Sequence, residues 1–133
     1  MEFKLHHSRV FKHFISAPFT YITLFPIILL DIVIEIYQHI CFPLWSIKTI
    51  KRTQYIKIDR HKLSYLRLPE KINCVYCGYV NGVIHYWTII AAETERYWCG
   101  IQHQNKSGFI PQPHQKDFLK YNDEKSFNKK FKL

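Results

Sequence analysis

Residues 14–47, FISAPFTYITLFPIILLDIVIEIYQHICFPLWSI, decide the fold of this chain, because they form a long apolar run without lysine or arginine. The basic-free stretch lies between Lys12 and Lys48 and would make about 52 Å of continuous helix at about 1.5 Å per residue. A bilayer's hydrocarbon core is only about 30 Å thick. One straight span is therefore excluded, and the prolines Pro18, Pro26 and Pro43 offer natural divisions. We predict a membrane-associated segment over 14–47, built from helices near 10–24 and 26–42.

Polar side chains mark one face of the second predicted helix. Asp31, Glu35, Gln38 and His39 recur at helical spacing and form a stripe. Two carboxylates near the centre of a span cost about 6 kcal/mol together, and the surrounding apolar residues return about as much. Three arrangements remain open: a full span with the stripe toward a partner or ion, a shallow hairpin with the stripe toward water, and an amphipathic pair in a soluble core.

The same stripe contains residue types that bind metals. Carboxylate and imidazole ligands suit iron, manganese or zinc. A second metal site is therefore considered at Asp31, Glu35, His39 and Cys41, with His61 and His85 as further donors.

The basic residues of the chain indicate an anionic binding partner and an orientation relative to the membrane. The chain has 133 residues and a formal charge of +9. Basic residues are more numerous after the apolar run than before it, which predicts a cytoplasmic location for the following domain. No recognisable nucleic-acid-binding motif accompanies the charge, so the expected partners are membrane lipid and a protein or a second copy of the chain.

Cysteine spacing carries the principal chemical hypothesis. Cys74 and Cys77 form a Cys-x-x-Cys pair, and Cys99 precedes His103 by four positions. Three thiolates and an imidazole suit a closed structural zinc site. An iron or iron–sulfur centre, in which Cys41 supplies a fourth thiolate, is the redox alternative. A reactive dithiol and four buried, inert cysteines also remain open.

Geometry limits the zinc hypothesis. A straight helix over 79–97 would separate its two ends by about 27 Å, whereas zinc ligands lie within about 2.3 Å of one ion. A shared site therefore needs a break near Gly82 or Ala92, or a fold-back of the loop before Cys74. No phosphate loop, nucleophile elbow or other catalytic constellation is present, so the sequence does not support an enzyme.

Four blocks carry a resemblance: DIVIEIYQHICFPLWSI, IDRHKLSYL, NCVYCGYVNGVIHY and ETERYWCGIQH, within about residues 30–103. They resemble a family of small bacterial proteins with a membrane-associated N-terminal segment, for which no activity is established. The resemblance implies a bacterial source, and hence the inner membrane. Family members often have proline after the third cysteine, where this chain has Gly100.

The expected architecture is mainly α: a membrane-embedded helical segment followed by a small helical domain that contains the cysteines. We predict a basic arm at 1–13, the membrane-associated segment at 14–47, the Cys/His domain at 48–103 and a basic, mobile tail at 104–133.

Overall fold

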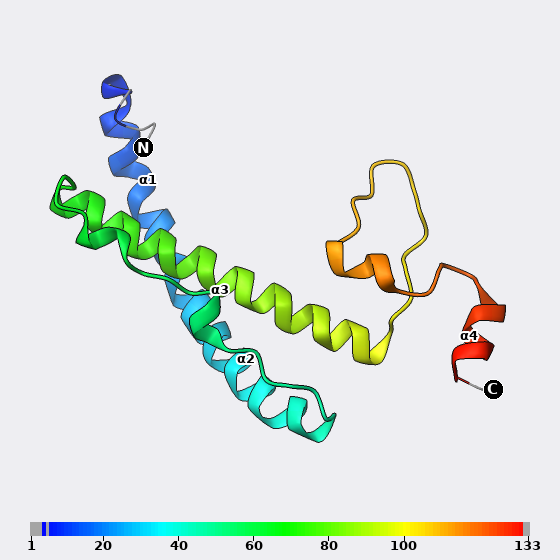
Figure 1. Cartoon of the computed structure of the whole chain (residues 1–133). Helices are drawn as coiled ribbons and strands as arrows, with labels where there is room; N and C mark the ends of the chain where they lie inside the picture. Colours follow the sequence, from blue (N-terminus) through cyan, green and yellow to red (C-terminus); the bar gives the residue numbers. More distant parts are fainter. Residues whose placement is uncertain (1–3, 5, 132–133) are drawn as a thin grey trace. The chain divides into compact units, whose positions relative to one another are not determined.

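A computed structural model of the chain describes residues 4 and 6–131 (Figure 1). The α-helices are α1 (Val10–Ile22), α2 (Leu24–Leu44), α3 (Leu68–Trp98) and α4 (Glu124–Phe131). Short 3-10 helices are η2 (His7–Arg9), η3 (Arg52–Gln54), η4 (Arg60–Lys62) and η5 (Pro113–Asp117). The described residues contain no β-strand, only one isolated bridge between Ile101 and Leu119. The predicted mainly helical fold, with an apolar N-terminal segment ahead of further helices, is confirmed.

The apolar segment forms two helices that meet at Thr23. Its side-chain hydroxyl donates to the carbonyl of Thr20 at 2.7 Å. Pro26 lies in the first turn of α2, where its missing N–H leaves no bond unmade. Val10–Leu44 is long and apolar enough to cross a membrane. The predicted helices, near 10–24 and 26–42, agree with the observed bounds to within two residues.

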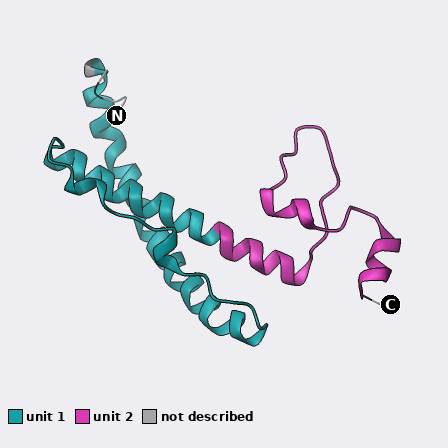
Figure 2. Ribbon diagram, in the orientation of Figure 1, with its two compact units in different colours: residues 1–87 teal, residues 88–133 magenta. Residues whose placement is uncertain are grey.

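The chain divides into two compact units, residues 1–87 and 88–133, and α3 contributes to both (Figure 2). The predicted boundaries at 13, 47 and 103 do not coincide with this division. In the first unit, α3 crosses the junction of α1 and α2 (Figure 1). There the hydroxyl of Tyr76 donates to the carbonyl of Thr20 at 3.0 Å and lies 2.9 Å from Oγ1 of Thr23.

The start of α3 follows from local sequence. Pro69 occupies the first turn, and the Glu70 carboxylate accepts the backbone N–H of Arg67 at 2.8 Å. Glu70 also pairs with Lys4 at 2.5 Å. The motif NCVYCGYVNG, residues 73–82, lies inside α3.

Two glycines in that motif allow the α2–α3 connection to pass close to α3. Gly78 and Gly82 lie one helical turn apart and both are buried. A Cβ atom at Gly82 would lie 2.9 Å from Cα of Ile56, and one at Gly78 would lie 3.1 Å from the carbonyl oxygen of Lys57. The missing side chains therefore let the backbone of residues 56–58 lie directly on the helix.

The second unit begins with the last turns of α3. Gly100, at φ +60°, has the left-handed conformation that favours glycine, and its N–H donates to the carbonyl of Glu95 at 3.0 Å. Gly100 therefore caps the C-terminal end of α3. Within this unit Gln115 and Phe118 are buried, so part of the segment predicted as a mobile tail is packed.

We predict that Gly82→Ala lowers the free energy of unfolding by about 1–3 kcal/mol, because the added methyl overlaps the backbone of Ile56. Asn81→Ala is the matched control, since its neighbouring side chain is exposed on the same helix. Thermal unfolding followed by circular dichroism in mild detergent measures both. A Gly82→Ala protein as stable as the control would contradict the close approach.

Candidate functional site

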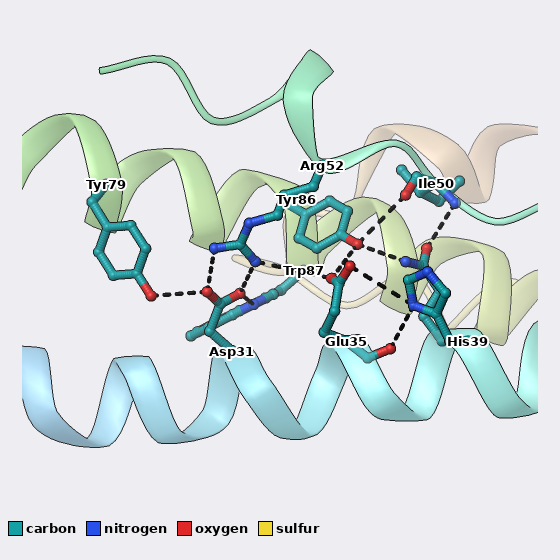
Figure 3. Close-up of polar contacts among 9 residues, drawn as sticks. Asp31, Glu35, His39, Ile50, Arg52, Tyr79, Tyr86 and Trp87 are labelled. Atoms are coloured by element: carbon teal, nitrogen blue, oxygen red, sulfur yellow. Dashed lines mark hydrogen bonds and ion pairs between the residues drawn. The ribbon is translucent and has the colours of Figure 1, made fainter. Parts of the chain in front are cut away.

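The acidic stripe of α2 faces α3 and the connection between them (Figure 3). Asp31 is the centre of the contact, and its side chain is only 6% exposed. Arg52, from η3, donates Nη1–H to Oδ1 of Asp31 at 2.7 Å and Nη2–H to Oδ2 at 2.5 Å. The pair is bidentate, the geometry in which a guanidinium binds a carboxylate most strongly.

Two aromatic residues of α3 complete the surroundings of Asp31. The hydroxyl of Tyr79 donates to Oδ2 at 2.8 Å, and the indole N–H of Trp87 donates to Oδ1 at 3.3 Å. Each carboxylate oxygen of Asp31 thus accepts two hydrogen bonds. A buried carboxylate is costly unless it is paired and hydrogen-bonded, and this one is both.

The stripe continues through Glu35 and Gln38. The hydroxyl of Tyr86 donates to Oε2 of Glu35 at 2.7 Å and accepts a hydrogen bond from Nε2 of Gln38 at 2.6 Å. The side-chain oxygen Oε1 of Gln38 accepts a hydrogen bond from the backbone N–H of Ile50 at 2.7 Å. These contacts attach the connection to both helices (Figure 3).

Electrostatics fix the protonation of the donors. The hydrogen bond to Asp31 raises the pKa of Arg52 above its usual range. Burial and the hydrogen bond to Glu35 raise the pKa of Tyr86 to about 12, and burial and Asp31 also raise the pKa of Tyr79. These three groups therefore keep their protons at neutral pH and act as fixed donors. Through these donors the arrangement joins α2, α3 and the connection between them.

The second metal site considered from the sequence falls within this network. Asp31 and Glu35 both face Arg52, whose Nη1 lies 3.9 Å from Oε2 of Glu35. Nδ1 of His39 lies 2.8 Å from the backbone oxygen of Glu35, and Cys41 is half-buried. His61 lines a separate cavity, and the ring of His85 stacks edge-on against Tyr55.

The structure divides the predicted zinc ligands between the two units. Cys74 and Cys77 lie on α3 in the first unit and line one cavity with His13 and Arg60. Cys99 and His103 belong to the second unit, where Nε2 of His103 lies 3.9 Å from Oε1 of Glu95. Neither of the breaks considered above, near Gly82 or Ala92, is present in α3, which is unbroken from Leu68 to Trp98. Throughout residues 4 and 6–131, no group of three or more His, Cys, Asp and Glu side chains is placed to hold a metal.

Sequence reasoning missed the partners of the stripe. Tyr79, Tyr86 and Trp87 recur at spacings of seven and eight, which place them on one face of a helix. Tyr79 and Trp87 donate to Asp31, and Tyr86 contacts Glu35 and Gln38. A polar stripe on one helix and a Tyr/Trp face on another could have predicted that the two helices pack together. Nothing in the sequence distinguished Arg52 from the neighbouring basic residues.

Comparison with protein-family models, curated proteins and solved structures gives no significant match. The family resemblance noted in the sequence therefore stays a prediction, and the site is interpreted from its own geometry.

We predict that Arg52→Ala lowers the free energy of unfolding by about 2–3 kcal/mol, because it leaves the Asp31 carboxylate buried without its cation. Lys57→Ala is the control, since Lys57 pairs with Asp59 at the surface, where ion pairs contribute less than about 1 kcal/mol. Urea unfolding monitored by tryptophan fluorescence compares them. Equal stability of the two variants would contradict a structural role for the Asp31–Arg52 pair.

Proposed function

We propose that this protein is a membrane-surface anchor, in which α1 and α2 lie within one leaflet of a bilayer and α3 with the α2–α3 connection faces water. It presents this helical surface to a protein partner beside the membrane. The observation that carries the proposal is the exposure of the apolar segment. Only 6% of the most apolar 18-residue window within Val10–Leu44 is buried. A helix in a soluble core would bury most of that window.

The exposed apolar residues of α2 lie opposite its polar stripe. At 3.6 residues per turn, Leu29 and Ile36 lie roughly 140–160° around the helix from Asp31. Both side chains are more than half exposed. The same face contains Phe25, Val33 and Ile40, which are also exposed. The stripe is satisfied by α3 and Arg52, so the opposite face is the one available to lipid.

Charge along the connection favours a surface location over a full span. Residues 45–67 contain seven basic side chains: Lys48, Lys51, Arg52, Lys57, Arg60, Lys62 and Arg67. Arg52 and Ile50 of this connection contact the middle of α2. If α2 crossed the bilayer, the connection would enter the hydrocarbon beside it, at a cost of about 2.5–3.5 kcal/mol for each lysine or arginine near the centre. At the membrane surface, the basic residues of the connection instead contact lipid headgroups and avoid this cost.

The positive charge also supports a choice of membrane face. Each lysine or arginine near an anionic leaflet contributes about 1 kcal/mol of attraction. We therefore propose the cytoplasmic face, and, on the family resemblance, that of the bacterial inner membrane.

Metal binding remains a separate hypothesis. Zinc at Cys74, Cys77, Cys99 and His103, or iron in its place, stays a prediction from the sequence, and α3 has no break near Gly82 or Ala92. The cavity shared by Cys74, Cys77 and His13 is the observation that favours chemistry at the thiol pair. Elemental analysis of protein purified without chelators, beside Cys74→Ser and Cys99→Ser, tests whether the two ends share a metal.

We predict that Ile36→Asp weakens binding to phosphatidylglycerol-containing liposomes at least tenfold, because it removes an apolar side chain worth about 1.5–3 kcal/mol when buried and adds a charge. Ile110→Asp is the control, since Ile110 is 87% exposed in the second unit and the change in charge is the same. Flotation through a sucrose gradient gives the bound fraction. Equal flotation of both variants would exclude α2 as the lipid-binding element.

We predict further that both ends of the apolar segment are reached from one side of the membrane. Lys12→Cys and Lys48→Cys, each made in a chain whose native cysteines are replaced by serine, introduce thiols at exposed positions. An impermeant maleimide should label both in inside-out vesicles and neither in right-side-out vesicles. Labelling of the two positions from opposite sides would show a span instead.

A further inference from the structure

The first unit contains an open, almost wholly apolar groove of about 810 Å³. It lies where α3 crosses the junction of α1 and α2, and its lining includes Leu24, Ile28, Ile58, Ile72, Val75 and Tyr79. Its volume falls within the range of about 300–1,000 Å³ that is typical of small-molecule sites. A flexible hydrocarbon chain is the ligand that such a lining favours.

Two ionisable side chains interrupt the apolar lining. Lys71 lines the groove and forms no ion pair with any residue that the structure describes. Nδ1 of His61 is buried beside the groove without a hydrogen-bond partner in the described part of the chain. A buried polar nitrogen without a partner is costly, and a change of the His61 rotamer that turns Nδ1 toward the groove would let a headgroup oxygen satisfy it. The groove thus combines an apolar body with a cation and an unused hydrogen-bonding atom.

The groove is continuous with the exposed apolar surface of the helices. Ile28 and Ile72 line it and are also 42% and 50% exposed. A lipid beside α2 therefore needs no passage through water to enter.

We propose that the groove binds one acyl chain of an anionic phospholipid, whose headgroup contacts Lys71 and His61. The chain's net charge of +9 favours an anionic headgroup over a zwitterionic one. This inference rests on the proposed membrane association and adds to it a specific lipid site, distinct from general contact between α2 and the bilayer.

Photocrosslinking tests the site with phosphatidylglycerol that bears a diazirine in its acyl chain. The full chain is bound to vesicles of phosphatidylcholine with a few per cent of this probe, irradiated, digested and mapped by mass spectrometry. A phosphatidylcholine probe with the same acyl chain runs in parallel. Competing vesicles contain an excess of unlabelled phosphatidylglycerol or of free oleate.

Four variants, two in the groove and two matched controls outside it, make the test specific for the groove. Val75→Trp fills the groove, and Val33→Trp makes the same change on the exposed face of α2, outside it. Lys71→Gln removes the groove's cation, and Lys48→Gln removes one exposed charge elsewhere.

We expect crosslinks to concentrate on residues 72–79 with the phosphatidylglycerol probe. They should fall at least fivefold in Val75→Trp and remain in Val33→Trp. Lys71→Gln, and not Lys48→Gln, should reduce the preference for phosphatidylglycerol over phosphatidylcholine. Unlabelled phosphatidylglycerol should compete.

Other outcomes overturn the proposal in distinguishable ways. Crosslinks spread along α1 and α2 and unchanged by Val75→Trp would leave membrane association intact and eliminate the groove site. Equal labelling by both probes would eliminate the anionic headgroup, and competition by oleate alone would make the occupant a free fatty acid. Bound protein without crosslinks at any residue of α1, α2 or α3 would count against both the groove and the proposed anchor.

Discussion

The Asp31–Arg52 ion pair is the interaction on which the first unit depends. Asp31 lies in the middle of an apolar helix, where an isolated carboxylate would oppose both burial in protein and contact with lipid. Its four hydrogen bonds come from the α2–α3 connection and from α3. The charge that interrupts this apolar helix therefore determines which segments pack against it. Arg52 also lies 5.9 Å from the centre of the Tyr86 ring, so one guanidinium contacts both helices.

Close approach at two glycines is the second constraint. The connection reaches Asp31 only because its backbone lies on α3 at Gly78 and Gly82. This gives the motif NCVYCGYVNG a structural reason that is independent of its cysteines. The thiols at positions 74 and 77 suggest metal or redox chemistry. The glycines at positions 78 and 82 determine how the connection packs on α3.

The sequence predicted the local structure well and the long-range contacts poorly. Proline positions and the basic-free run fixed the bounds of α1 and α2, because helix length and interruption are local properties. The stripe was identified, yet its three proposed neighbours, a partner, an ion or water, did not include the chain's own Arg52. That contact joins residues 21 positions apart, and the contact with Tyr79 joins residues 48 apart. Helical periodicity shows which residues share one face of a helix. It does not show which segment packs against that face. The capping role of Gly100 was not predicted for a related reason: it depends on a positive φ, which spacing alone does not reveal.

The contact between Trp87 and Asp31 has a consequence for synthesis. The indole belongs to a residue made 56 positions after the carboxylate that it binds. Arg52 follows Asp31 by 21 positions, but Tyr79 and Trp87 are made only later. A ribosome therefore releases α1 and α2 as an apolar segment whose central carboxylate lacks two of its four hydrogen bonds until α3 has followed. During that interval the segment is suited neither to deep insertion nor to stable packing in water. In the proposed anchor, membrane association is thus coupled to completion of the first unit, and a chain interrupted before residue 87 would leave the Asp31 carboxylate incompletely hydrogen-bonded.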